Sequence, residues 1–199
     1  MGGNYGHLSV TVPIARQLDI AGYEVVFALR DLRLAAEILT PAGIPFLPAP
    51  MVSITASSEP INYADILLVS GMGDEFSFRG LMQGWNSLLD LLLPQAIVID
   101  HAPFALIAAR ARATPAIAIG SGFTVPPIAE PLPTIRPWEA ISAERLMQAD
   151  AVALESVNSH LKVNGGLALT RLSELFTAEP ALLTTFPELD HYGVREQEV

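Results

Sequence analysis

The sequence predicts an α/β fold in which a parallel β-sheet carries helices on both faces. Short runs of apolar, often β-branched residues alternate with longer segments whose apolar residues recur at helical spacing. This alternation is typical of βαβ units, whose right-handed crossovers lay helices against the sheet. Hydrophobic residues make up 51% of the 199 residues, which is enough to bury a core, and the length suits one ordinary domain.

The first half of the chain is predicted to alternate between helix and strand. The clearest helical period runs from Asp74 to Pro94, where apolar residues recur over several turns. Asp31 is a candidate N-cap, and the continuous apolar run 24–29 is typical of a strand buried on both faces. The predicted helices cover 8–21, 31–39, 62–69 and 74–93, and the predicted strands cover 24–29 and 44–47.

The second half continues the pattern around a proline-rich interruption. Five prolines within 122–138 predict an irregular segment, after which Ser142 can start a long helix. The polar tail after Pro187 is expected to be loose. The predicted strands are 96–99, 116–119 and 181–184, and the predicted helices are 104–113, 142–162 and 169–176.

Charge and hydropathy exclude several classes of partner. The net charge of -10, from 21 acidic and 11 basic residues, disfavours nucleic acid and anionic lipid. The most apolar stretches are short or interrupted by proline and arginine, so no membrane span is predicted. The first residues lack the features of a secretory signal, and we therefore expect a cytoplasmic location.

Ligands of open parallel sheets bind beyond the carboxyl ends of the strands. Three places meet that condition: the glycine-rich loop 2–7, Asp100-His101 and Gly120-Ser121-Gly122. Glycines in the first loop would let a ligand approach the backbone, and His7 at the following helix start can act as a general base. A histidine that is simply packed or hydrogen-bonded at a helix start remains the alternative.

Asp100 is the natural partner for such a base. An aspartate that accepts the second ring N-H fixes the tautomer of the imidazole and stabilises the imidazolium. A helix cap or a solvated strand end is the alternative for Asp100. Asp100 with His101 lacks further ligands at suitable spacing, so no metal site is predicted, and Ser121 lacks the pattern of a nucleophile elbow.

Several segments resemble nucleotide-sugar-dependent glycosyltransferases of the GT-B fold, which modify macrolides, flavonoids and similar hydroxylated acceptors. The opening residues Gly-Gly-Asn-Tyr-Gly-His-Leu carry the resemblance most clearly, and it extends over most of the chain. The segments concerned are 2–8, 13–18, 21–27, 94–100, 116–127 and 183–192.

The resemblance implies a Rossmann-like acceptor-binding domain over 1–186, followed at 187–199 by the start of an interdomain linker. His7 would take the proton from the acceptor hydroxyl, with Asp100 as its partner, in an inverting transfer without metal. The chain itself would bind no cofactor, and a UDP- or dTDP-sugar would be the co-substrate of the full enzyme. The residues expected to border the site of a small hydrophobic acceptor are Gly6, Phe78, Trp85 and Phe123.

The sequence departs from the family pattern at both ends. No strand precedes the glycine-histidine loop, so the neighbours of that missing central strand are expected to have open edges, and the product to be marginally stable or prone to aggregate. No donor-binding domain follows Tyr192, so the chain is expected to be inactive alone and to need a C-terminal partner domain or a longer gene product.

Two other functions remain open. The chain could be a non-catalytic module that binds a small molecule or completes a hetero-oligomer. It could instead bind a dinucleotide through the loop from Gly2 to Gly6, although that loop lacks the full G-x-G-x-x-G pattern and a preceding strand.

Overall fold

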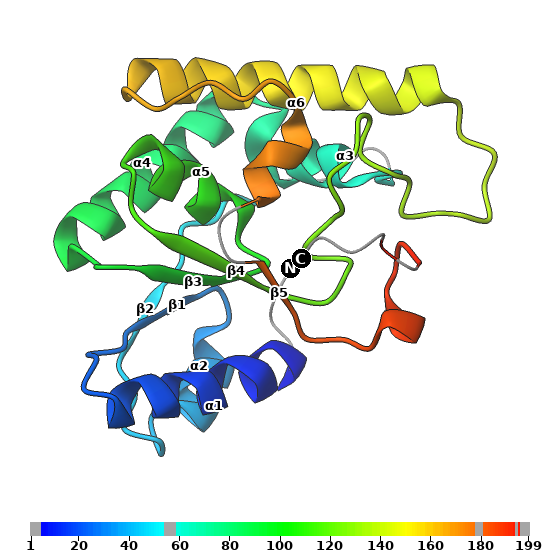
Figure 1. Ribbon diagram of the computed structural model, residues 1–199. Coiled ribbons are helices and arrows are strands. Elements are labelled where there is room, and N and C mark those ends of the chain that lie inside the picture. The colour runs from blue at the N-terminus through cyan, green and yellow to red at the C-terminus, as the bar shows by residue number, and fades with distance from the viewer. Residues whose placement is uncertain (1–4, 54–58, 178–180, 194, 196–199) are drawn as a thin grey trace. The chain divides into compact units, whose positions relative to one another are not determined.

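A computed structural model describes residues 5–53, 59–177, 181–193 and 195 (Figure 1). The chain divides into two compact units, Met1–Met51 and Val52–Val199. All paired strands in the sheets of both units are parallel, and helices pack on them. The predicted α/β class is therefore confirmed.

The first unit consists of two helices and two strands: α1 (Tyr5–Ile20), β1 (Phe27–Leu29), α2 (Leu32–Ile38) and β2 (Phe46–Pro48). β1 pairs with β2 in register Phe27 to Phe46. The predicted strand 24–29 is thus shorter than expected, because residues 24–26 have no ladder partner among the described residues. The predicted cap is confirmed, since Asp31 Oδ1 accepts a hydrogen bond of 3.0 Å from the Leu34 amide.

The core of the first unit lies between its helices and strands. Leu8 and Val12 from α1 meet the buried face of α2, which presents Leu34, Ala35 and the following Leu39. Apolar side chains of both strands pack against this cluster. The helical spacing of Leu8 and Val12 thus explains why α1 forms and which side of it is buried.

The second unit contains a three-stranded sheet in the order β3-β4-β5. The strands are β3 (Ile97–Asp100), β4 (Ala116–Gly120) and β5 (Ala181–Leu183). Within the described ranges, β3 pairs with β4, and β4 pairs with β5 on its other side. The register sets Asp100 beside Ile119 and Gly120 beside Leu183, so these strand ends share one edge of the sheet.

Three helices of the second unit begin at side-chain caps, close to the helix starts that the sequence predicts. Asn62, Asp74 and Ser142 each accept a hydrogen bond from an amide three residues further on. The helices are α3 (Tyr63–Leu67), η1 (Leu68–Met72), α4 (Glu75–Leu92), α5 (Pro103–Ala111), α6 (Ala143–Val163), η2 (Leu172–Phe176) and η3 (Pro187–Leu189).

Helix α5 is the centre of this unit. It contacts β3 and β4, and it also packs against α4 and α6. Every α5 residue except Arg110 is buried, and the Arg110 side chain donates a 2.9 Å hydrogen bond to the carbonyl oxygen of Glu174. The alanine-rich sequence of α5 therefore reflects close packing on all sides.

Two predictions for the last third of the chain need correction. The expected helix 169–176 is a shorter 3₁₀ helix, η2, because Arg171 is extended and the Thr170 amide bonds to the Glu174 side chain. The described part of the tail after Pro187, expected to be loose, is held on the unit by Arg195 and His191, which contact the carbonyl oxygens of Val125 and Ile135. These contacts join residues far apart in the sequence, so local composition does not reveal them.

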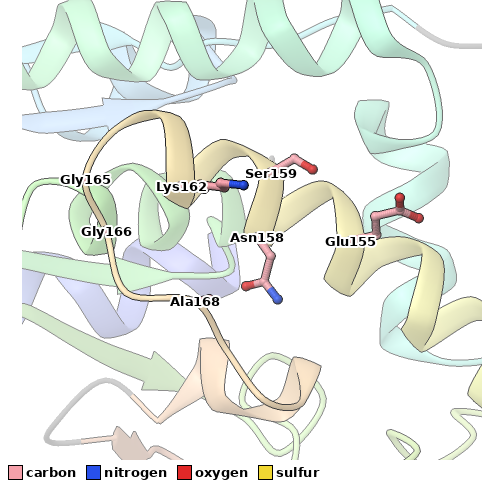
Figure 2. Close-up of a pocket in the computed structure, with 7 residues that line it drawn as sticks. All are labelled: Glu155, Asn158, Ser159, Lys162, Gly165, Gly166 and Ala168. Atoms are coloured by element: carbon pink, nitrogen blue, oxygen red, sulfur yellow. The ribbon is translucent and has the colours of Figure 1, made fainter.

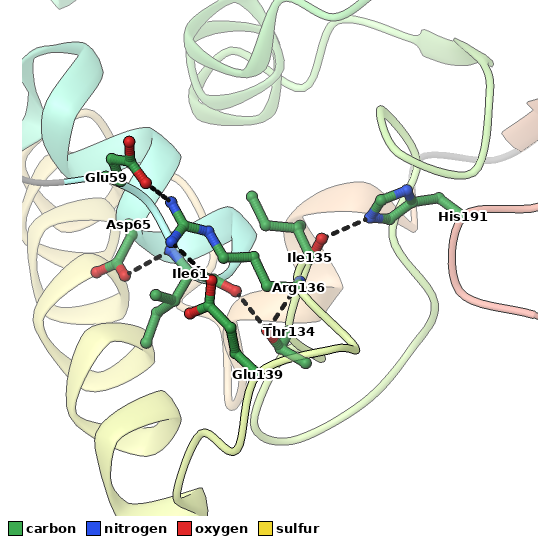
Figure 3. A network of polar contacts seen from close by, with 8 residues as sticks. All are labelled: Glu59, Ile61, Asp65, Thr134, Ile135, Arg136, Glu139 and His191. Atoms are coloured by element: carbon green, nitrogen blue, oxygen red, sulfur yellow. Dashed lines mark hydrogen bonds and ion pairs between the residues drawn. The ribbon is translucent and has the colours of Figure 1, made fainter.

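The proline-rich segment is irregular, as predicted, but a buried polar network holds it in place. Asp150 accepts hydrogen bonds from the Leu132 amide at 2.8 Å and from Asn62 Nδ2 at 3.0 Å. Further along, the Thr134 hydroxyl donates to the carbonyl oxygen of Ile61, and Arg136 pairs with acidic side chains on both sides (Figure 3). Side chains thus satisfy the backbone polar groups that the prolines leave outside regular structure.

Asp150 makes the stability of this network depend on pH. The residue is 7% exposed, and burial raises the pKa of its carboxyl group to about 6, although the hydrogen bonds from Leu132 and Asn62 oppose the shift. The folded state therefore holds the proton more tightly than the unfolded state. This contribution to stability is fully present below the unfolded pKa and is lost as pH rises through about 6.

We predict that the free energy of unfolding contains an Asp150 contribution that grows by about 1 kcal/mol between pH 7 and pH 5. Asp150→Asn should remove it, whereas Asp19→Asn, at an exposed position, should not. Urea denaturation of the three proteins at pH 5, 6 and 7 measures the difference. The same pH dependence in wild type and Asp150→Asn would contradict the assignment.

Candidate functional site

Asp100 and Gly120 lie together at the carboxyl end of the β3-β4-β5 sheet. Asp100 is the last residue of β3, and Gly120 is the last residue of β4. A Cβ atom at position 120 would lie 3.3 Å from Asp100 Oδ1 and 2.1 Å from Thr124 Oγ1. Gly120 also has a φ of 143°, which L side chains rarely adopt. The Asp100 carboxylate thus lies against a backbone position that only glycine fits.

His101 leaves the sheet in an unusual conformation. Its φ is 51°, in the left-handed region. The imidazole meets Tyr63 and Phe123 edge-on, with ring centroids 6.1 Å and 5.9 Å away. His101 is therefore part of an aromatic cluster beside Asp100.

This ring cluster gathers residues from five distant parts of the sequence. Tyr63 also contacts Phe176, and Phe123 contacts His191 with ring centroids 5.4 Å apart. We define the ring cluster as Tyr63, His101, Phe123, Phe176, His191 and Tyr192. It covers the same end of the second unit as the candidate aspartate, so aromatic surface and a carboxylate occur side by side.

The ring cluster contains one buried phenol, that of Tyr63, and one half-buried phenol with a buried hydroxyl group, that of Tyr192. Tyr63 is 1% exposed, and burial raises its pKa above the usual range, with further contributions from Tyr192 and Asp100. Burial also raises the pKa of Tyr192, whose hydroxyl has no hydrogen-bond partner within the described residues. Both phenols therefore stay protonated at neutral pH.

The other predicted catalytic residue lies in the first unit. His7 is the third residue of α1, and its carbonyl oxygen accepts a 2.8 Å hydrogen bond from the Thr11 hydroxyl. Gly6 precedes it, and a Cβ atom there would meet no described atom within 4 Å. Residues 2–4 of the predicted glycine loop lie outside the described residues. Since His7 and Asp100 belong to different units, their pairing stays a prediction.

The three predicted acceptor-binding aromatic residues divide into two groups. Phe78 on α4 packs against Phe104 and His160, with centroid distances of 6.1 Å and 6.0 Å, and Trp85 on the same helix is 7% exposed. Phe123 belongs to the ring cluster. Contact with an acceptor stays a prediction for all three.

His160, which packs against Phe78, has a pKa below its usual value. Burial lowers this pKa, and the charge of nearby Arg112 lowers it further.

Sequence reasoning missed several members of this site. Tyr63 lies in a short predicted helix, and neither Tyr63 nor His191 was predicted as a site residue. Tyr192 fell in the tail predicted to be loose. A usable signal was that the segment 183–192, which ends in His-Tyr, shares the family resemblance with Gly120-Ser-Gly.

A separate surface pocket of about 510 Å³ lies at the end of α6 (Figure 2). The Asn158 amide is already engaged there, because it exchanges hydrogen bonds of 3.0 Å and 2.8 Å with the backbone of Leu169. The remaining polar side chains point in different directions in Figure 2. The residues around it are Glu155, Asn158, Ser159, Lys162, Gly165, Gly166 and Ala168.

The described residues contain neither a candidate metal site nor a candidate membrane-spanning helix. No group of three or more histidine, aspartate or glutamate side chains in that part of the chain is arranged to hold a metal ion. None of its helices combines the length and the apolar character needed to cross a membrane.

We predict that Gly120→Ala lowers the free energy of unfolding by about 2 kcal/mol, because the new methyl group meets Thr124 and the positive φ disfavours alanine. Gly80→Ala in α4 is the matched control, since a Cβ atom there meets no described atom within 4 Å. That control should stabilise the helix by about 0.5 to 1 kcal/mol. Chemical denaturation measures both values, and equal stability of the two variants would refute the close packing at Gly120.

The chain resembles known proteins in structure, whereas sequence comparison gives no match. No protein-family profile matches the sequence, and no curated protein resembles it significantly. Among solved structures, spinosyn forosaminyltransferase SpnP matches with a TM-score of 0.52 and 17% identity, over 92% of this chain and 44% of that chain. SsfS6, a glycosyltransferase of Streptomyces sp. SF2575, matches with a TM-score of 0.47 and 17% identity, over 79% and 42%.

The chain thus spans less than half the length of either solved structure. At 17% identity the likeness to SpnP establishes the fold, and it covers nearly all of this chain. We conclude that the chain has the Rossmann-like α/β fold found in GT-B glycosyltransferases.

Proposed function

We propose that the chain is the acceptor-binding domain of an inverting glycosyltransferase. Such an enzyme moves a sugar from a nucleotide sugar to a hydroxyl group of a small hydrophobic acceptor. The observation that carries the proposal is the likeness to SpnP over 92% of the chain. The placement of Asp100 at the carboxyl end of a parallel strand, where α/β sheets bind ligands, supports it.

In this proposal His7 is the general base. Its imidazole removes the proton from the acceptor hydroxyl while that oxygen attacks the anomeric carbon of the donor. The bond from the anomeric carbon to the nucleoside diphosphate breaks, and the configuration inverts. Asp100 accepts the second ring N-H of His7, which fixes the tautomer and stabilises the imidazolium.

The acceptor would lie against apolar and aromatic side chains. Phe123 is the strongest of the proposed contacts, because the ring cluster places it beside His101 at the same strand ends as Asp100. Gly6 leaves space next to His7. Such a surface suits a hydrophobic molecule that carries hydroxyl groups.

The donor would be a UDP- or dTDP-sugar, and we assign its binding to residues beyond these 199. The chain spans 44% of the length of SpnP, which supports a division of the two substrates between two domains. Transfer would then require a donor-binding domain, supplied as a partner or on the same polypeptide.

We predict that His7→Ala lowers kcat for sugar transfer at least about 100-fold in a protein that joins this chain to a GT-B donor-binding domain. Arg16→Ala, at an exposed position on the same helix, is the control and should retain activity. The assay measures release of nucleoside diphosphate in the presence of a hydroxylated acceptor. Unchanged transfer by His7→Ala would remove His7 as the base.

The same assay separates catalysis from simple binding. If acceptor affinity is unchanged in His7→Ala while kcat falls, the imidazole acts in the chemical step. If the joined wild-type protein binds acceptor but releases no nucleoside diphosphate, the chain is a binding module and the proposed reaction is wrong.

A further inference from the structure

Asp190 and Arg195 form an ion pair that is hydrogen-bonded to the loop that follows β4. Arg195 Nε donates to Asp190 Oδ2 at 2.8 Å, and Arg195 Nη2 donates to the carbonyl oxygens of Gly122 and Val125 at 3.3 Å and 2.6 Å. The side chains of Asp190 and Arg195 are 3% and 15% exposed. We call this ion pair, with its two backbone contacts, the clasp.

The clasp fits closely against Gly122. A Cβ atom at that position would lie 2.1 Å from Asp190 Oδ1 and 2.6 Å from its carboxyl carbon. Asp190 Oδ1 also accepts a 2.9 Å hydrogen bond from the Tyr192 amide, within the same segment. The backbone of the loop at Gly122 and the carboxylate of Asp190 are therefore in close contact.

The residues held by the clasp include an aromatic pair. Phe123, next to Gly122, meets His191, next to Asp190, with ring centroids 5.4 Å apart and planes at 89°. His191 Nε2-H donates to the carbonyl oxygen of Ile135 at 3.1 Å (Figure 3). The clasp thus ties the start of the irregular segment 122–138 to residues 190–195, and the separate contact from His191 ties Ile135, near its other end.

We propose that Asp190 and Arg195 are positioning residues that hold the loop after β4, and with it Phe123 and His191, in the shape of the acceptor site. This inference rests on the proposed function for the identity of the ligand. The order of the loop itself can be measured without any ligand.

The first test is amide hydrogen exchange by NMR on the full chain. The amides of Thr124 and Val125 both donate to the Ser121 carbonyl oxygen, at 3.0 Å and 3.1 Å, so they report on the loop. Arg195→Gln should speed their exchange at least about tenfold, while amides of α6 such as Val157 keep their rates. Glu188→Gln, an exposed position in the same segment, is the matched control and should change neither.

A second variant disturbs the clasp through a substitution in the loop. Gly122→Ala does not substitute Asp190 or Arg195. It adds a methyl group at the position that the Asp190 carboxylate occupies, and so displaces that carboxylate. It should give the same faster exchange at Thr124 and Val125. If Arg195→Gln does not fold, Gly122→Ala decides the matter, and unchanged loop exchange in the folded variant overturns the proposal.

The third test asks whether the clasp serves a ligand. Titration of the chain with the flavonol quercetin, followed by tryptophan fluorescence, should give a Kd at least about fivefold weaker for Arg195→Gln than for Glu188→Gln. Equal affinity of the two variants, with a loosened loop, would overturn the positioning role. Failure of the wild type to bind quercetin would count against the proposed function, while loop exchange would still decide the clasp.

Discussion

The carboxyl end of β4 has no room for a side chain, and the candidate site depends on that constraint. Gly120 adopts a φ of 143° with Thr124 and the Asp100 carboxylate against its Cα. Any larger residue would have to displace one of them. The same turn starts the loop that carries Phe123, so one glycine sets both the position of the carboxylate and the exit of the aromatic loop.

Local signals in the sequence were sufficient for most elements of the fold. The cap at Asp31 and the helix start at Ser142 were predicted because a side-chain oxygen and an amide three residues later interact within one turn. The left-handed backbone of His101 was not predictable, since non-glycine residues rarely adopt it and its ring is held by Tyr63 and Phe123 from elsewhere in the chain. Local pattern does not encode such contacts.

The candidate site was predictable to a similar extent. Asp100 followed from the rule that ligands bind at strand ends, and the structure places it there. Asp190 and Arg195 could not be found from sequence, because their partners at Gly122 and Val125 lie some seventy positions earlier, as the Arg195 contacts show. Backbone carbonyl groups leave no mark on composition.

Helix α6 shows what polar anchors add to an apolar interface. Ser142 caps its start, Asp150 is bound by Asn62 and Leu132, and Asn158 is bound by the Leu169 backbone. The last two lie roughly two helical turns apart. An apolar stripe alone would tolerate sliding along the helix axis, because hydrophobic contact has no direction. Hydrogen bonds at separate levels would all break in such a slip, so α6 has a single axial position in its unit.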